Sequence, residues 1–308
     1  MAMRREVLRR LRVEPGTRFR MADHAPDWLP DHLRGLGKRA RRAAAAQMLA
    51  DNVAELAEVQ DLLYADNRYS LLIVLQAMDA AGKDGTIKHV MSGVNPQGCT
   101  VHSFKKPCEE EIDHDFLWRF ASRAPARGMI GIFNRSYYEN VLVEKVHPEL
   151  LEASQLPDGK RNTAFWRARY EDINAFEKHL TNNGTIVLKF FLNVSPEEQR
   201  ARFLDRLDDP SKHWKFSAAD MTERGLWEQY QQAFTEAIRA TSTAWAPWYV
   251  IPADRKWAMR AMVSDIIVTT LQGLHMHYPD ITDEAREQMA AAREQLQAEL
   301  AAELARNG

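Results

Sequence analysis

The segment 71–90, LLIVLQAMDAAGKDGTIKHV, contains residues that could bind a phosphate group. In a phosphate-binding loop of the pattern GxxxxGK followed by Ser or Thr, backbone N–H groups surround the phosphates and the Lys reaches their terminal oxygens. Gly82 and Lys83 match this pattern, whereas Ala77 replaces the first Gly and Asp84 replaces the hydroxyl residue. An apolar strand pattern before the loop and a helix pattern after it favour a phosphate loop over a tight turn with a surface Lys.

The loop and the helix turn after it would supply the phosphate contacts. A helix start offers free N–H groups and the positive end of its dipole to an anion, and Lys83 would add a compact positive charge. We therefore expect the phosphates to contact the following residues as well: Ala81, Gly82, Asp84, Gly85 and Thr86.

Phosphoryl transfer also needs Mg²⁺, for which oxygen atoms are the preferred ligands. The usual hydroxyl ligand is missing, and the apolar strand in GMIGIFNRSYYEN ends in Asn134 where an Asp normally stands. The remaining carboxylates are Asp79 inside the loop and Glu139 beyond the strand, so we expect these two to bind or orient Mg²⁺ or Mn²⁺. The alternative for Asp79 is a turn-stabilising Asp that accepts backbone hydrogen bonds.

Further cations gather in two regions of the sequence. Arg135 follows a strand at the end where open α/β sheets bind ligands, and six more cations occur as three pairs, one before Arg135 and two after it. Together they exceed what one triphosphate requires, which suggests a longer anionic substrate; the alternative is a solvated basic face paired with neighbouring Asp residues. The six are Arg119, Arg123, Arg202, Arg206, Lys212 and Lys215.

These residues must be positioned by an α/β fold. Helical spacing over 36–64 predicts a long helix, and five short apolar segments separated by helical patterns predict a parallel sheet with helices on both faces. The predicted strands are Leu71–Ala77, Thr100–Phe104, Met129–Phe133, Thr185–Leu192 and Trp248–Ile251.

A lid is predicted between the fourth and fifth strands, over 195–244. Ser195 caps a helix that should stop near Asp209, because Pro210 follows. A basic loop joins it to a second helix, which should start after Asp220. We expect an N-terminal arm and helix over 1–69, a core over 70–280 that contains the lid, and a helical tail over 281–308.

The overall composition restricts the partners. The chain has 308 residues with a formal net charge of −2, so only local basic clusters could meet a polyanion. Two cysteines, Cys99 and Cys108, indicate no disulfide framework and a cytoplasmic location. No apolar run approaches membrane-spanning length. The Arg-rich N-terminus is interrupted by Glu6 and Glu14 and is read as part of the mature protein rather than as a transit peptide.

Four motifs occur together in an order that resembles the family-2 polyphosphate kinases, over roughly residues 10 to 275. The motifs are DAAGKDGTIKHV, IGIFNRSYYENVLVEKV, DPSKHWKFS and APWYVIPADRKW. The resemblance implies a three-layer α/β/α fold of the P-loop kinase type with a helical lid. It also implies dependence on Mg²⁺ and direct phosphate transfer between inorganic polyphosphate and a nucleotide.

The resemblance also implies roles for single residues. Asp79 corresponds to the essential loop Asp of the family, Lys83 to its loop Lys, and Arg135 to the Arg after the second motif. Glu139 resembles the carboxylate of the subgroup called class III, whose members phosphorylate nucleoside monophosphates and diphosphates, whereas Asn140 departs from the more usual Asp. The matching lid and helix cations are Arg202, Arg206, Lys212, Lys215 and Lys88.

The sequence thus predicts a Mg²⁺-dependent enzyme that transfers the terminal phosphate of polyphosphate to AMP and ADP, making ADP and ATP, with the reverse reaction left open. A P-loop kinase that uses ATP to phosphorylate a nucleotide or another small molecule is the alternative. A non-enzymatic nucleic-acid-binding protein is disfavoured by the near-neutral charge. We expect no nucleic-acid or membrane partner, and a homo-oligomer, either a dimer or a tetramer.

Overall fold

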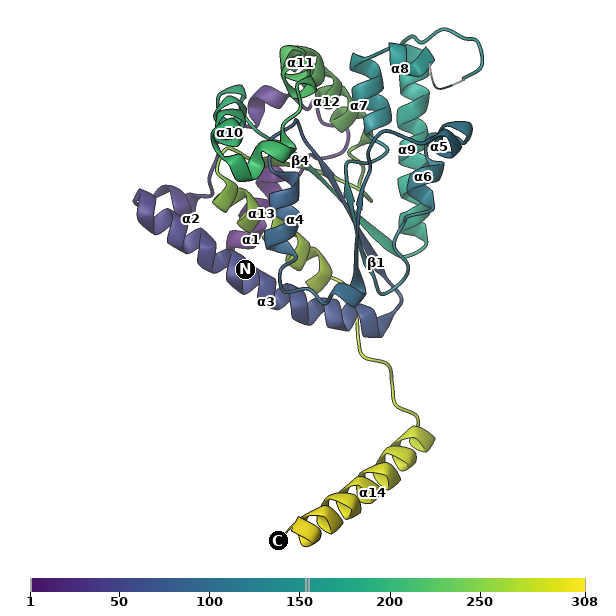
Figure 1. Cartoon of the computed structure of the whole chain (residues 1–308). Helices are drawn as coiled ribbons and strands as arrows, with labels where there is room; N and C mark the ends of the chain where they lie inside the picture. Colours follow the sequence, from purple (N-terminus) through teal and green to yellow (C-terminus); the bar gives the residue numbers. More distant parts are fainter. Residues whose placement is uncertain (1, 153, 155, 308) are drawn as a thin grey trace.

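A computed structural model describes residues 2–152, 154 and 156–307, and a five-stranded sheet lies at its centre (Figure 1). All strand pairs are parallel, and the strand order is β2-β3-β1-β4-β5. Each predicted strand is confirmed to within one residue at either end. The bounds are β1 Ser70–Gln76, β2 Cys99–Ser103, β3 Ile130–Asn134, β4 Thr185–Asn193 and β5 Trp248–Pro252.

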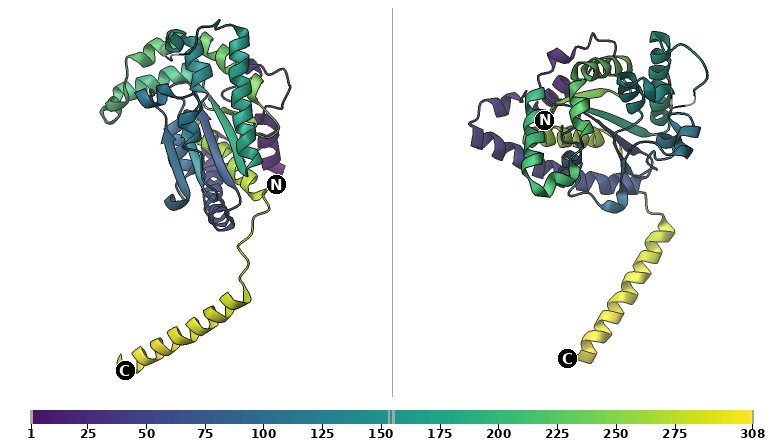
Figure 2. Two further views of the ribbon diagram at one scale, coloured as in Figure 1. Left: turned by 90° about the vertical axis from the view of Figure 1, so that its right-hand side faces the viewer. Right: turned by 45° about the horizontal axis from the view of Figure 1, so that its top comes forward.

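Helices cover both faces of this sheet, as the views in Figure 2 also show. One layer contains α13, Lys256–Gln272, which packs on α3, Lys38–Asp66, on α4, Lys83–Val90, and on α1, Ala2–Leu11. The other layer consists of α7 Glu139–Val146, α9 Thr163–Asn182 and α12 Trp227–Thr241. The predicted three-layer α/β/α architecture is therefore confirmed.

Burial on both faces explains the composition of the central strands. Every residue of β1 and of β5 is buried, as is nearly all of β4. Successive side chains of a strand point to opposite faces of the sheet. When helices cover both faces, all of these side chains are buried, so the apolar residues run continuously instead of alternating with polar ones. That is why the run before the phosphate loop reads LLIVL.

Short elements complete the connections between these layers. Their bounds are η1 Met21–Asp23, α2 Asp31–Arg34, η2 Pro96–Gly98, α5 Glu109–Asp113, α6 Trp118–Ala121 and α8 Glu149–Glu152.

The segment after β4 begins as the sequence predicts. α10 spans Pro196–Asp208, the Ser195 side chain accepts a hydrogen bond from the backbone N–H of Glu198, and the turn η3, Pro210–Lys215, follows. The second helix differs from the prediction. It starts earlier, as α11 Ala219–Gly225, and a break at Leu226 separates it from α12. Asp220 does not cap a helix because its carboxylate accepts a hydrogen bond from Arg206.

α12 packs against α7 and α9, and its apolar side chains Tyr230, Phe234 and Ile238 are buried. Of the segment 195–244, α10, η3 and α11 lie beyond the carboxyl ends of the strands (Figure 1).

The C-terminal helix α14, Asp283–Asn307, extends away from the rest of the molecule (Figures 1 and 2). Four large apolar side chains along this helix are exposed to solvent: Met289, Leu296, Leu300 and Leu304. Among the described residues, the helices are too short or too polar to cross a membrane.

Candidate functional site

The loop between β1 and α4 has an unusual backbone. Gly82, the residue before α4, has φ +113°, and Ala80 has φ +60°, a left-handed value that is uncommon for a residue with a side chain. Lys83 opens the helix, and its Nζ donates a hydrogen bond to the carbonyl oxygen of Ala77 at 3.0 Å. Burial lowers the pKa of the Lys83 ammonium. The turn brings the Lys back over the loop, as phosphate binding requires.

Arg202 from α10 holds this backbone in place. Only 4% of its side chain is exposed, and its guanidinium donates to the carbonyl oxygens of Ala80 at 3.1 Å and Ala81 at 2.6 Å. It also donates to the carbonyl oxygens of Ala253 at 2.5 Å and Asp254 at 3.3 Å. Arg202 was predicted to contact phosphate, whereas in this structure its donors are directed at the backbone of the loop and of the segment after β5.

Arg135 connects the two carboxylates that were predicted to hold a metal. It has φ +66° at the carboxyl end of β3, and its Nη2 lies 3.0 Å from Asp79 Oδ1. Its Nη1 lies 3.7 Å from Glu139 Oε2. Burial raises the pKa of Glu139, and the charge of Arg135 opposes this shift. The structure therefore brings Asp79, Arg135 and Glu139 together beside Lys83.

These residues line a cavity of about 260 Å³ between the loop, α7, α11 and α12. Three of its polar lining residues, Asp220, Glu223 and Tyr230, were not among the predicted site residues. Burial and then the nearby charge of Asp79 raise the pKa of Asp220. The full lining consists of Ala77, Met78, Asp79, Arg135, Glu139, Leu142, Val143, Ala219, Asp220, Glu223, Tyr230 and Phe234.

Asp84 occupies the position of the usual hydroxyl ligand and connects three elements. Its Oδ1 accepts a hydrogen bond from Asn134 Nδ2 at 2.8 Å, and its Oδ2 lies 3.7 Å from Lys215 Nζ in η3. Thr86 is buried, and its hydroxyl donates to the carbonyl oxygen of Gly82 at 3.0 Å. The Asp84 carboxylate thus links β3 and η3 to the first turn of α4.

The remaining predicted cations are more dispersed. Arg206 pairs with Asp220 at 2.8 Å, and Lys212 of η3 pairs with Asp209, the residue before this turn, at 2.7 Å. Arg119 lies 3.3 Å from Glu111 and packs its guanidinium over two aromatic rings near β2. Arg123 and Lys88 are exposed. Among the described residues, none of these five side chains makes a hydrogen bond with the backbone of the loop.

A buried ion pair supports the start of α7. Lys189 Nζ in β4 lies 2.6 Å from Glu177 Oε2 in α9, and both side chains are fully buried. The hydroxyls of Tyr137 and Tyr138 donate to Glu177 at 2.9 Å each. These two Tyr residues directly precede Glu139, so the pair fixes the backbone that presents the site carboxylate. Its only sequence signal was a Lys in the otherwise apolar strand TIVLKFFLN.

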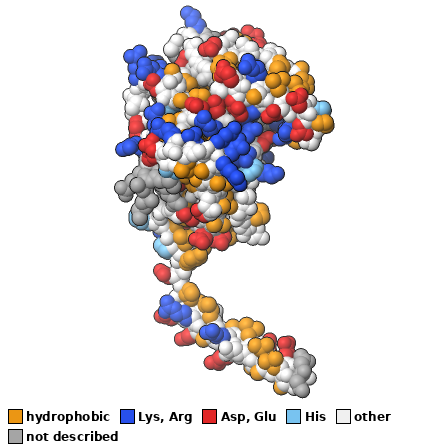
Figure 3. Space-filling model, turned by 90° about the vertical axis from the view of Figure 1, so that its left-hand side faces the viewer, with side chains coloured by type: hydrophobic (Ala, Val, Ile, Leu, Met, Phe, Trp, Pro, Cys, Tyr) orange, Lys and Arg blue, Asp and Glu red, His pale blue; other side chains and the backbone are white. Residues whose placement is uncertain are grey.

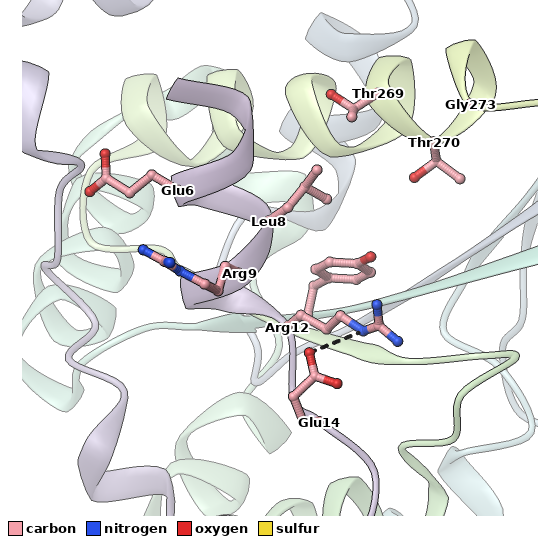
Figure 4. Close-up of a pocket in the computed structure, with 9 residues that line it drawn as sticks. Glu6, Leu8, Arg9, Arg12, Glu14, Thr269, Thr270 and Gly273 are labelled. Carbon is pink, nitrogen blue, oxygen red and sulfur yellow. Dashed lines mark ion pairs between the residues drawn. The ribbon is translucent and has the colours of Figure 1, made fainter. Parts of the chain in front are cut away.

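The largest cavity described lies elsewhere, around the end of α1 (Figure 4). It measures about 830 Å³ and is open to solvent. Arg9 and Arg12 line it opposite Thr269 and Thr270 of α13, and Arg12 Nε lies 3.6 Å from Glu14 Oε1. No residue of the phosphate loop lines this cavity.

A parallel sheet with a Gly-Lys loop after β1 and a set of helices above it defines a P-loop kinase-type protein. The family model for polyphosphate kinase 2 matches residues 39–279, and the chain belongs to this family.

The relatives agree with this assignment. The chain is 49% identical over 251 residues to an ADP-polyphosphate phosphotransferase of Rhodopseudomonas palustris, covering 81% of this chain and 87% of the relative. It is 45% identical to an AMP/ADP-polyphosphate phosphotransferase of Meiothermus ruber, with 88% and 96% covered. A crystal structure of polyphosphate kinase 2 from Arthrobacter aurescens superimposes with a TM-score of 0.81 at 40% identity, covering 92% of this chain and 95% of that one.

Proposed function

We propose that this protein transfers the terminal phosphate of inorganic polyphosphate to AMP and ADP, forming ADP and ATP. The observation that carries the proposal is the group formed by Lys83, Asp79, Arg135 and Glu139 at one edge of the loop, in a chain of the polyphosphate kinase 2 family. The names of the relatives from R. palustris and M. ruber support these acceptors.

The reaction we propose is an in-line displacement. An oxygen of the acceptor's terminal phosphate attacks the terminal phosphorus of the donor, a new P–O bond forms, and the bond to the rest of the polyphosphate breaks. The shortened polyphosphate leaves with the electron pair. Lys83 and Arg135 compensate the charge of the transferred group. A phosphate oxygen is already an anion, so the attack needs no strong general base.

The residues present fit Mg²⁺. No cluster of three or more His, Cys, Asp or Glu side chains that could hold a metal is found in the described part of the chain. Mg²⁺ is typically held by one or two carboxylates together with substrate phosphates and water, which matches Asp79 and Glu139 on either side of Arg135. When bound, the ion would neutralise phosphate charge; Mn²⁺ could replace it.

The cavity of about 260 Å³ beside Asp79 and Glu139 is the proposed site for the acceptor phosphates. We propose that α10, η3 and α11 form a lid that excludes water, because hydrolysis of the donor is the competing reaction. Within this lid, Lys215 and Arg206 are the proposed phosphate contacts, whereas Arg202 positions the loop backbone.

The test combines purified protein, Mg²⁺ and long-chain polyphosphate with AMP or ADP and no added ATP. We expect ADP and ATP to appear, and Asp79→Asn to abolish transfer without changing the melting temperature. Turnover of nucleotide with ATP as donor, but none with polyphosphate, would favour the alternative kinase. Wild-type rates in Asp79→Asn would refute the proposed metal role of its carboxylate.

Two further features are proposed. The exposed apolar side chains of α14, including Leu296 and Leu300, support association of chains into a dimer or tetramer, which light scattering of the full chain and of a chain shortened at residue 280 would test.

Two free cysteines, Cys99 and Cys108, support a reducing, cytoplasmic location.

A further inference from the structure

Two cations lie at the start of α13: Arg260 beside the first turn of α4, and Lys256 within range of the charges of Glu198 and Asp205 in α10. Lys256 and Arg260 make no hydrogen bond or ion pair within the part of the chain that the structure describes, and Arg260 Nε is buried. A Cβ atom added to Gly85, in the first turn of α4, would lie 3.1 Å from Arg260 Nη2. Arg260 therefore flanks the loop on the side that faces α13.

A second group of unpaired cations lies at the beginning of α3. Lys38, Arg39 and Arg42 are exposed, and among the described residues they have no hydrogen-bond or ion-pair partner. We call these three residues the basic end of α3. The first turn holds no acidic residue, and the preceding Gly37 offers no side-chain cap. Cations here oppose the helix dipole, and like charges four positions apart repel each other, so an anionic ligand would relieve both costs.

The two groups lie on the same side of the molecule. α3 packs on α13, and Asn52 Nδ2 donates to Ser264 Oγ at 3.0 Å, one helical turn beyond Arg260. Arg42 precedes Asn52 by ten residues, which corresponds to about 15 Å along the helix. Figure 3 views the face that contains α2, α10 and the start of α3, and Lys and Arg side chains gather across it.

The in-line geometry of phosphoryl transfer places the donor chain on the α13 side of the loop, away from the acceptor cavity. Asp79, Arg135 and Glu139 line that cavity toward α7 and α12. In phosphoryl transfer, the attacking and leaving oxygens are roughly in line on opposite sides of the phosphorus atom. The rest of the donor must therefore leave the loop away from the cavity, and Gly85 with Arg260 forms the flank on the α13 side.

We propose that the distal phosphates of the donor bind along this flank, first at Lys256 and Arg260 and then at the basic end of α3. This inference rests on the proposed function and adds to it a dependence on the length of the donor chain. A short donor reaches only the loop and the start of α13, whereas a long polyphosphate also reaches α3. The protein should therefore prefer long chains, and the preference should depend on α3.

The test compares tripolyphosphate with long-chain polyphosphate as donor at saturating ADP. In the variant Lys38→Gln/Arg39→Gln/Arg42→Gln, we expect KM for the long donor to rise on the order of tenfold, with kcat and the KM for tripolyphosphate unchanged. In Lys256→Gln/Arg260→Gln, KM should rise for both donors. The matched control Arg167→Gln/Lys178→Gln/Arg293→Gln loses the same charge from α9 and α14 and should leave both KM values unchanged.

Direct binding gives a second readout that does not need turnover. For labelled long-chain polyphosphate without nucleotide, the dependence of log K on log salt should become shallower by about 2 in the α3 variant, by analogy with single-stranded nucleic acids. An unchanged KM and salt slope in this variant, or equal increases of KM for both donors, would overturn the inference. Absence of all transfer by the wild-type chain would instead contradict the proposed function, while the binding comparison would still decide whether α3 binds the chain.

Discussion

Replacing Arg202 by Met tests whether this guanidinium holds the loop or binds the substrate. Met keeps much of the apolar stem but removes the donors to the carbonyl oxygens of Ala80, Ala81, Ala253 and Asp254. If Arg202 is a structural residue, the loss must appear in the free energy of unfolding without any ligand. If it only binds phosphate, that free energy should not change.

The magnitude follows from the contacts. Two of the four hydrogen bonds are 2.5 and 2.6 Å long, and each hydrogen bond to a charged group contributes about 1.5–3 kcal/mol. In the variant, water can satisfy the acceptors of the two longer hydrogen bonds. Water can also solvate Glu198, the 34% exposed ion-pair partner of Arg202, so these contacts add little to the loss. We therefore expect Arg202→Met to lower the free energy of unfolding by about 3–5 kcal/mol, as when one member of a buried charged group is removed.

Urea denaturation of the ligand-free chain, followed by circular dichroism, measures this change. The control is Arg200→Met on the same helix, where the side chain is exposed, and we expect a change within about 0.5 kcal/mol. The donor KM of Arg202→Met should also rise, because Ala80 at φ +60° is no longer held. Equal unfolding curves for Arg202→Met and wild type, combined with a raised donor KM, would refute the structural role.

Three further results are expected. Glu139→Gln should lower kcat/KM for AMP more than for ADP, since the carboxylate lies beside the proposed acceptor cavity, and equal losses in initial-rate assays would contradict this role. Burial alone would lower the pKa of His147, but contacts with Glu223 at 3.0 Å and with a second Glu outweigh it and raise the pKa above 6.5. The charged pair between His147 and Glu223 therefore contributes its full stabilisation of the contact between α11 and α7 below pH 6.5, and this stabilisation is lost as the pH rises through the raised pKa. Hydrogen exchange of the α11 amides should then accelerate with pH by more than the intrinsic exchange rate does. His147→Gln should remove this additional acceleration, and an unaltered acceleration in the variant would count against the contact. Lys189→Met leaves Glu177 buried without its partner and should cost about 3–5 kcal/mol in urea denaturation, whereas a wild-type midpoint would show that the pair is dispensable.

The five strands and the phosphate loop could be predicted because their signals are local. An apolar run that is buried on both faces, followed by Gly82 and Lys83, needs no knowledge of distant residues. The second helix of the predicted lid was misplaced for the opposite reason. Asp220 resembles a helix cap in sequence, but Arg206 of α10 takes its carboxylate, and nothing within a few residues of Asp220 records this.

The sequence by itself determined the order of the strands along the chain, the position of the loop and the residue types at the site, because each depends on neighbours in the chain. Only the tertiary structure decided how each Arg is used. Arg135 lies between two carboxylates beside a cavity, whereas Arg202 is buried against carbonyl groups 122 and 51 residues away along the chain. A guanidinium binds whichever acceptors the fold brings within about 3 Å of it, and those acceptors come from segments that meet only after folding.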